Sequence, residues 1–276
     1  MSPPFRRKYL STRLTQVTNR HPSQLHINAL RLFSGYTHSL PTPTFEIDAL
    51  MPAATDPSNT MSQPADIDHP MSRPIVLGSR SPRRQELLSL LVPKERIQIL
   101  PPSDPDEPGF EGLHDEAAIV DQLQHIARMK NVNVRARLEC PRDALVLTAD
   151  TTIVAGTPGA FVVLGQPPAT SDWQETVREW FNRHYFGQTH RAMTAVVLSH
   201  PDGRRSEQVV ETRVTMRATD AVHLDWYLNT GEPLGKAGGY ALQGAGSVFI
   251  EQVDGSLSNV VGLPLEAVRV MLGQFA

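Results

Sequence analysis

Two short segments of this sequence contain residue types that suit the binding of an anion. The first, SRSPRR at Ser79–Arg84, places two arginines directly after Ser81 and Pro82. Ser81 is of the type that caps a helix, and proline suits the first helical position, so the arginines should stand at a helix N-terminus beside free backbone N–H groups. Such a helix end with two guanidinium groups favours a phosphate chain. A capped helix with two solvated arginines is the alternative for this segment taken alone.

The second segment is rich in glycine and runs from Gly235 to Gly246 (GKAGGYALQGAG). Its glycines would let the backbone lie close to a ligand. Lys236 supplies a mobile positive charge for phosphate, and Gln243 can both donate and accept hydrogen bonds at the edge of a base. The alternative is a flexible loop without a ligand. The pattern GxxxxGK[ST] is absent, so this is not a Walker loop.

One carboxylate, Asp150, follows a continuous apolar run at residues 144–149 that is short enough to be a buried central strand. We expect this strand to end at Asp150. A carboxylate there is costly unless it meets water, a cation or a donor, and the carboxyl ends of strands in open α/β sheets line ligand sites. A Mg²⁺ ion between Asp150 and a phosphate would use the oxygen ligands that this ion prefers. Asp150 as the cap of a turn is the alternative.

Strands and helices that would position these residues are predicted from the spacing of apolar residues. A short strand, Ile75–Leu77, leads through Gly78 into the arginine-bearing turn, and a helix with leucines at positions 87, 88, 90 and 91 follows. An acidic loop from Asp104 to Glu111 precedes a helix over residues 117–132, which carries Lys130 near its end. The remaining predictions are helices over 172–183 and 220–229, a hairpin of strands 191–199 and 207–216, a strand over 247–252 and a closing helix over 265–275.

Composition excludes several classes of function. The 276 residues are 40% hydrophobic, enough for a real core in one large or two small domains. A net charge of −3 argues against a partner that is a nucleic acid polymer, and no apolar run is long enough to cross a membrane. The single cysteine, Cys140, rules out an intrachain disulfide and fits a reducing, cytoplasmic compartment. The histidines lack HxH or HExxH spacing, so a zinc site has no support.

The chain divides at about Met71. Residues 1–70 contain clusters of Pro, Ser, Thr and Asn without sustained periodicity, which predicts a disordered N-terminal extension. Its first 45 residues are basic and contain no acidic residue, a composition that a transit peptide can also have, but they lack the apolar core of a secretory signal. We expect the compact domain, residues 71–276, to start at Met71 or alternatively at Met61, with a mis-called upstream extension before it.

Four separate motifs carry a resemblance that spans Ile75 to the C-terminus. They are SRSPRRQELL at 79–88, LTADTTIV at 147–154, GEPLGKAGGYALQG at 231–244 and SNVVGLPL at 258–265. In this order and spacing they resemble the Maf (septum-formation-inhibitor-like) nucleoside triphosphate pyrophosphatases. The resemblance implies an α/β fold of the Maf/ITPase-like type, in which a long mixed twisted sheet with flanking helices forms two lobes around a nucleotide cleft. It also implies hydrolysis of a nucleoside triphosphate to the monophosphate and pyrophosphate, a divalent metal cation (Mg²⁺ or Mn²⁺) and a homodimer.

The same resemblance assigns substrate-binding roles to five residues. Ser79, Arg83 and Arg84 match the family's phosphate-binding positions. Lys236 and Gln243 fall in the loop that contacts phosphate and base.

Catalytic and metal-binding roles also follow from the resemblance. Asp106-Glu107 resembles the family's acidic pair, in which Glu107 matches a catalytic or metal-linked carboxylate. Lys130 matches the catalytic lysine of the family's LAxxKA helix, although Asn131 stands where the alanine should be. Asp150 matches the carboxylate of the ADT motif, either as a metal ligand or as the base that positions the attacking water.

One departure from the family concerns Gln166. The family usually has LGKP after the ADT strand, whereas this chain reads LGQP at 164–167. One preorganised charge at such a site is typically worth about 10²–10³ in rate, so the chain could instead be a catalytically weak, nucleotide-binding regulator of septum formation and cell division. A compensating cation, Arg183 or Arg191, is a further hypothesis.

The motifs also narrow the expected substrate. The paired arginines, the ADT sequence and the glutamine of GGYALQG resemble the branch that acts on dTTP and UTP. The branch that acts on 7-methyl-GTP tends to carry a tryptophan–arginine pair and a glutamate in place of Gln243. We therefore predict a pyrimidine nucleotide, modified forms included, as substrate.

Overall fold

A computed structural model of the protein describes residues 73–103, 107–139, 143–218 and 221–275. The predicted N-terminal extension lies outside these residues, as do Asp106 and Cys140. None of the helices in the described ranges combines the length and apolar character that crossing a membrane requires.

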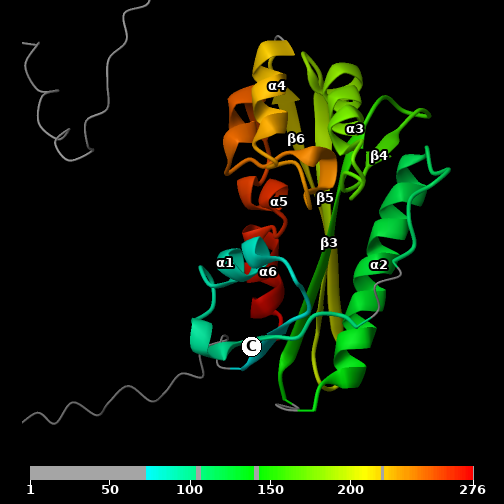
Figure 1. The fold of residues 1–276 in the computed structure, drawn as a ribbon. Coiled ribbons are helices and arrows are strands. Elements are labelled where there is room, and N and C mark those ends of the chain that lie inside the picture. Colours follow the sequence, from blue (N-terminus) through cyan, green and yellow to red (C-terminus); the bar gives the residue numbers. More distant parts are fainter. Residues whose placement is uncertain (1–72, 104–106, 140–142, 219–220, 276) are drawn as a thin grey trace, which may run out of the picture. The chain divides into compact units, whose positions relative to one another are not determined.

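Seven strands of the described residues form one sheet in the order β2-β1-β3-β5-β6-β7, and β4 pairs with β3 off this path. β1 runs parallel to β2 and β3, whereas the other strand pairs are antiparallel. Helices flank this mixed sheet (Figure 1), which confirms the predicted α/β class. The strands are β1 (Ile75–Leu77), β2 (Ile97–Ile99), β3 (Leu145–Ala155), β4 (Val162–Leu164), β5 (Thr189–Ser199), β6 (Arg205–Met216) and β7 (Ile250–Asp254).

The α-helices are α1 (Pro82–Leu88), α2 (Glu116–Arg137), α3 (Trp173–Trp180), α4 (Ala221–Asn229), α5 (Leu257–Val261) and α6 (Leu265–Gly273). Four shorter helical segments are η1 (Lys94–Arg96), the π-helical η2 (Phe181–Tyr185), η3 (Ala237–Gly239) and η4 (Ala245–Phe249).

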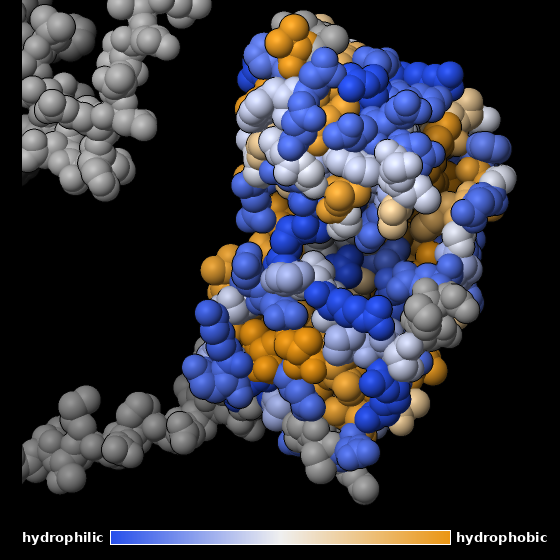
Figure 2. Space-filling model, in the orientation of Figure 1, coloured by the Kyte–Doolittle hydropathy of each residue, from blue (hydrophilic) through white to orange (hydrophobic). Residues whose placement is uncertain are grey.

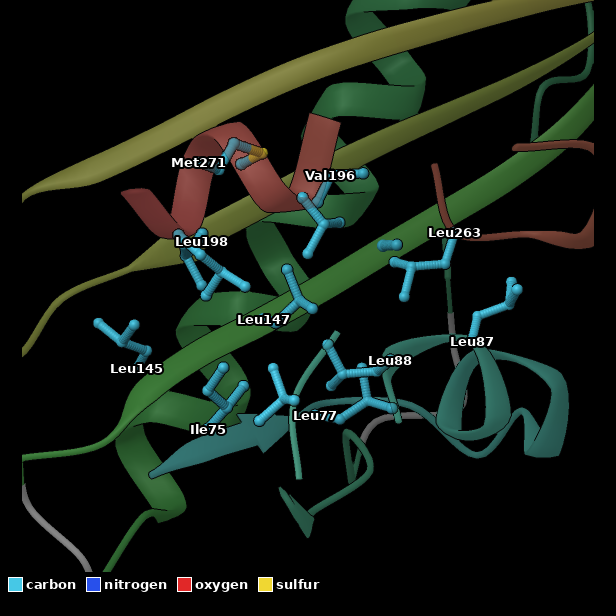
Figure 3. Packing of buried hydrophobic residues seen from close by; sticks show 14 of the residues in the cluster. Ile75, Leu77, Leu87, Leu88, Leu145, Leu147, Val196, Leu198, Leu263 and Met271 are labelled. Atoms are coloured by element: carbon cyan, nitrogen blue, oxygen red, sulfur yellow. The ribbon is translucent and has the colours of Figure 1, made fainter. Parts of the chain in front are cut away.

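Apolar side chains of β3 alternate between two cores on opposite faces of the sheet, as the pleat of a strand requires. On one face, Leu145 and Leu147 pack with β1, β5, α1 and α6 (Figure 3). On the other face, Val154 packs with Ile119 and Leu123 of α2. Figure 1 shows α2 on one side of the sheet and α1 and α6 on the other. The long strand β3 is therefore buried between helices over most of its length.

A third core lies toward the other end of β3 and is aromatic. Phe181 makes ring contacts with Tyr185, Tyr227 and Phe249, with centroids 5.0, 5.8 and 5.1 Å away. These rings are essentially fully buried. The predicted helix continues past Trp180 as the π-helical turn η2.

Several predicted boundaries were wrong. α1 ends at Leu88, and Leu90 is 72% exposed because Ser89 caps the helix one turn earlier than the leucine spacing indicated. The strand predicted for 144–149 continues to Ala155, so Asp150 lies in the middle of β3 and not at its end. The start of the strand predicted for 247–252 is the helical turn η4, and β7 begins at Ile250.

Other predicted elements are confirmed in type. β5 and β6 form the predicted antiparallel hairpin, and helices α4 and α6 overlap the ranges predicted for them. The short elements β2, β4 and α5 were not predicted, because three to five residues are too few to show a periodicity.

Candidate active site

A gap in the sheet along one edge of β3 forms the base of the site. β1 pairs with Leu145–Leu147, and β4 pairs with Ile153–Ala155 on the same edge. Between these partners, residues 148–152 pair only with β5 on the opposite edge. Asp150 bonds to α2 on one face of the sheet and Thr151 bonds to Arg84 of α1 on the other, yet both side chains line one cavity. The gap therefore lets one ligand reach both faces of the sheet.

The cavity at this gap has a volume of about 550 Å³. Figure 2 shows a hollow between the part of the molecule around α1 and the part around α3 and α4, with hydrophilic residues at its centre. Five described lining residues are basic and two are acidic, an excess of positive charge that suits a polyphosphate. All eight predicted site residues line this cavity: Ser79, Arg83, Arg84, Glu107, Lys130, Asp150, Lys236 and Gln243.

Arg84 is held at the cavity wall by three separate segments of the chain. Its Nε donates to the carbonyl of Gly262 at 2.8 Å, and its Nη2 donates to Oγ1 of Thr151 at 2.9 Å. Its Nη1 donates to Oγ of Ser79 at 3.4 Å. Burial lowers the pKa of Arg84, and the nearby charge of Asp150 acts in the opposite direction. A guanidinium has five N–H groups, and the two that bond to none of the described residues can serve a ligand.

Ser79 organises the turn that carries the arginines. The residue is only 4% exposed, and its Oγ accepts hydrogen bonds from the backbone N–H of Ser81 and from Arg84. Ser81 caps α1 as predicted, because its side chain accepts from the N–H of Arg84. Arg83 also lines the cavity, and it makes no hydrogen bond or ion pair with any residue in the described ranges. The two arginines therefore differ: among the described residues, hydrogen bonds hold the Arg84 side chain but not that of Arg83.

Lys130 bridges the two predicted catalytic carboxylates. Its Nζ lies 2.6 Å from Oδ1 of Asp150 and 2.7 Å from Oε2 of Glu107. The side chains of Lys130 and Asp150 are 12% and 15% exposed, so this ion pair is well shielded, whereas that of Glu107 is 45% exposed. The ammonium ion thus compensates the carboxylate that would otherwise stand buried without a partner.

Three hydrogen bonds fix the turn of α2 that presents Lys130. Asn131 is 3% exposed, and its Nδ2 donates to the carbonyls of Val146 and Val197 in the sheet. One turn earlier, Oγ1 of Thr148 donates to the carbonyl of Ala127 at 2.9 Å. Asn131, which stands where the family motif has alanine, is therefore an anchor between α2 and the sheet.

The glycine-rich loop forms the opposite wall of the cavity. Lys236 donates from Nζ to the carbonyl of Glu232, and Gln243 is exposed at the cavity. Burial lowers the pKa of Lys236, and the positive charge of Arg83 lowers it further. Gly238 has φ +73°, and a Cβ there would lie 2.6 Å from both Ile153 and the hydroxyl of Tyr185. Only glycine fits at that position.

Asp150 and Glu107 are also the residues that could hold a metal. No group of three His, Cys, Asp or Glu side chains gathers as a metal site within the described ranges. Asp150 and Glu107 each bond to Lys130 through one oxygen, which leaves the other oxygen of each carboxylate for a cation. One or two carboxylates together with substrate phosphates are the donor set that Mg²⁺ usually takes. The residues present therefore fit a metal that arrives with the nucleotide.

The hypothesis of a compensating arginine for Gln166 was wrong. Gln166 lines the cavity, but neither Arg183 nor Arg191 does. Arg183 pairs with Glu179, and Arg191 pairs with Glu116 and Glu211. Both guanidinium groups are committed to these partners, because each lies within about 3 Å of a carboxylate oxygen.

Two groups that hold Arg84 were not predicted. Thr151 follows the predicted aspartate, and Gly262 lies in the SNVVGLPL motif, which received no role in the sequence. Gly262 acts through its backbone carbonyl, which residue type does not reveal. The alternation of β3 could have indicated that Thr151 faces the opposite side from Asp150.

Comparisons with known proteins agree with this geometry. The sequence model of the family described as Maf-like protein matches residues 74–275. A dTTP/UTP pyrophosphatase of Anaeromyxobacter dehalogenans is 38% identical over 205 residues, 73% of this chain and 94% of the relative. One of Myxococcus xanthus is 40% identical over 192 residues, 69% of this chain and 87% of the relative. The alignment with a solved nucleoside-triphosphatase / dITP/XTP pyrophosphatase of Mycobacterium abscessus covers 53% of this chain and 76% of that protein, with 12% identity and a TM-score of 0.31.

Proposed function

This chain belongs to the Maf family, and we propose that it is a nucleoside triphosphate pyrophosphatase that converts dTTP and UTP to the monophosphate and pyrophosphate. One observation carries this proposal. A single cavity brings Arg84 of α1 and Lys236 of the glycine-rich loop together with Asp150 of β3. Cations on two walls and a carboxylate at the sheet edge are what hydrolysis of a phosphoanhydride requires.

The choice of a pyrimidine nucleotide has two supports. Relatives that are 34–40% identical are named dTTP/UTP pyrophosphatases. Gln243 is exposed at the cavity on the glycine-rich loop, where its amide can both donate to and accept from a base edge. A glutamate at this position could only accept hydrogen bonds in its ionised form.

In the proposed reaction, water attacks the α-phosphate and pyrophosphate leaves. Arg84 stabilises the negative charge that develops on the phosphate oxygens, because its guanidinium is already fixed and needs no reorganisation. Arg83 and Lys236 neutralise the rest of the triphosphate. Asp150 orients the attacking water, either as the base that accepts its proton or as a ligand of the cation, while Lys130 holds the carboxylate in place at 2.6 Å.

A divalent cation would be held by Asp150 and Glu107 and would add charge neutralisation at the phosphates. The carboxylate oxygens not bonded to Lys130 are the ones suited to it. Either Mg²⁺ or Mn²⁺ matches such oxygen ligands.

Release of pyrophosphate by the full chain tests the function. A panel of dTTP, UTP, CTP, GTP, ATP and 7-methyl-GTP is assayed with Mg²⁺ or Mn²⁺, with Asp150→Asn as the inactive control. We expect dTTP and UTP to be preferred and pyrophosphate to be the product. Inorganic phosphate as product would indicate a phosphatase, and a preference for guanine nucleotides would overturn the pyrimidine assignment. Nucleotide binding without turnover would favour the alternative that this chain is a nucleotide-binding regulator of septum formation.

Two further proposals concern the assembly and location of the enzyme. We infer a homodimer from family membership, and light scattering of the purified chain tests it. A cytoplasmic location fits a single cysteine and a free nucleotide substrate, and cell fractionation tests it.

A further inference from the structure

Glu232, which does not line the cavity, ties the two ends of the glycine-rich loop together. Its Oε2 accepts a hydrogen bond from the backbone N–H of Ala245 at 2.7 Å, and its Oε1 accepts one from the N–H of Gly246 at 2.9 Å. At the other end of the loop, its backbone carbonyl accepts from Nζ of Lys236. One residue therefore fixes both the start and the end of the loop.

The carboxylate of Glu232 also connects the loop to the aromatic core. The hydroxyl of Tyr227 is 3.2 Å from Oε1 of Glu232 and 3.2 Å from the carbonyl of Gly239 in the loop. Tyr185, a second core tyrosine, donates to the carbonyl of Gly238 at 2.8 Å. The loop thus rests on core tyrosine hydroxyls at its centre and on Glu232 at its ends.

We propose that Glu232 is a positioning residue that sets the phosphate-binding Lys236 and the base-reading Gln243 at one fixed separation. Gln243 stands two residues before Ala245, whose N–H is held by the carboxylate, and Lys236 is held by the carbonyl of the same residue. Loss of the carboxylate contacts therefore releases the loop end next to Gln243, and it also loosens the segment whose backbone carbonyl holds Lys236. This inference rests on the proposed function of the two side chains.

Both the charge and the geometry of the Glu232 carboxylate make its contacts with the loop difficult for another side chain to reproduce. A carboxylate offers only acceptors, and it faces two N–H donors and one hydroxyl. In the variant Glu232→Gln, the amide oxygen can accept from one backbone N–H, and the amide NH₂ must then face the other donor. Hydrogen bonds to charged groups are roughly twice as strong as neutral ones, so the end of the loop should be released.

Kinetics of Glu232→Gln in the full chain test the proposal, with the exposed Glu251→Gln as the matched control. We expect kcat/KM for dTTP to fall about tenfold or more, as the loss of a charge-assisted hydrogen bond predicts. The preference for dTTP over GTP should narrow, because Gln243 no longer meets the base correctly. The control should keep both activity and preference. Lower activity with unchanged preference would assign Glu232 a merely structural role and overturn the proposal.

A double-mutant cycle with Lys236→Ala gives a second criterion. If Glu232 acts by placing Lys236, the loss caused by Lys236→Ala should be clearly smaller in the Glu232→Gln background than in the wild type. Losses that multiply independently would contradict the inference.

Hydrogen exchange separates this inference from the proposed function, because it needs no turnover. The amides of Ala245 and Gly246 should exchange at least about tenfold faster in Glu232→Gln than in the wild type if the carboxylate protects them. Unchanged exchange would overturn the positioning role even in an active enzyme, and faster exchange in an inactive chain would support the loop geometry alone. Should Glu232→Gln fail to fold, Glu232→Asp, which retains the charge but withdraws it by one methylene, carries the same expectations.

Discussion

Replacing each of the paired arginines by lysine should separate the role of Arg84, whose side chain is held by hydrogen bonds, from that of Arg83, which makes none within the described residues. Arg84→Lys keeps the positive charge but cannot reach Ser79, Thr151 and Gly262 at once, because an ammonium ion lacks the planar fork of a guanidinium. Arg83→Lys loses no contact within the described residues, and a lysine there can still neutralise phosphate.

The magnitude follows from the three contacts of Arg84. Losing two of its hydrogen bonds removes the preorganisation that a charge stabiliser needs, and removal of such a stabiliser typically costs about 10²–10³ in rate. That range corresponds to about 3–4 kcal/mol of transition-state stabilisation. For Arg83→Lys we expect a loss of about tenfold or less, since the charge is kept.

Pyrophosphate release from dTTP and UTP measures kcat and KM for both variants, and thermal unfolding verifies that each is folded. Arg84→Lys should lose mainly kcat, and Arg83→Lys should mainly raise KM. Equal losses in the two variants would refute the argument that the contacts of Arg84 make it the catalytic arginine. So would an Arg84→Lys enzyme with nearly full activity.

Three further predictions follow from single residues. Gln166→Lys should raise kcat/KM by up to about 10²-fold by returning a cation to the cavity wall, as steady-state kinetics will show. Gly238→Ala should lower the free energy of unfolding by about 2–4 kcal/mol in urea titrations, because this glycine has φ +73° and a Cβ there would clash with Tyr185. The control Gly165→Ala, which has open space around its Cβ position, should leave the free energy of unfolding unchanged. Burial lowers the pKa of His190 to about 3, so the unfolded state binds a proton at this histidine before the folded state does as the pH falls below about 6.5. The free energy of unfolding should therefore decline between pH 6.5 and pH 3 by up to about 1.4 kcal/mol per pH unit. The variant His190→Phe should show a smaller decline in the same unfolding measurements.

Local signals in the sequence were sufficient for the phosphate-binding turn. The strand Ile75–Leu77 and the cap at Ser81 occur at the predicted residues, because a strand ended by glycine and a helix started by Ser-Pro depend only on neighbours in the chain. The hairpin of β5 and β6 was predicted for the same reason, since Pro201-Asp202-Gly203 sets its turn.

Long-range contacts account for what the sequence did not reveal. The contact between Arg84 and Gly262 joins residues 178 positions apart and uses a backbone carbonyl. In the sequence, Asn131 is a departure from the LAxxKA motif, but in the structure its side-chain amide bonds to the backbone of two strands. In both cases the partner is a main-chain group, which any residue type supplies, so composition and spacing carry no trace of it.

The predicted end of the strand at Asp150 was wrong, but the ligand site expected there is supported by the cavity that Asp150 lines. The apolar run before it predicted a strand end, and ligands were expected at that end. β3 in fact continues through Asp150 to Ala155, and the end that matters belongs to its neighbour β1, which stops at Leu77 opposite Leu147. Asp150 and Thr151 are tolerated in mid-strand because no strand pairs with this stretch on that edge, so both residues line the cavity. A strand that paired with this stretch would satisfy the same backbone groups and remove the site, and the short lengths of β1 and β4 are therefore as necessary to the chemistry as the aspartate itself.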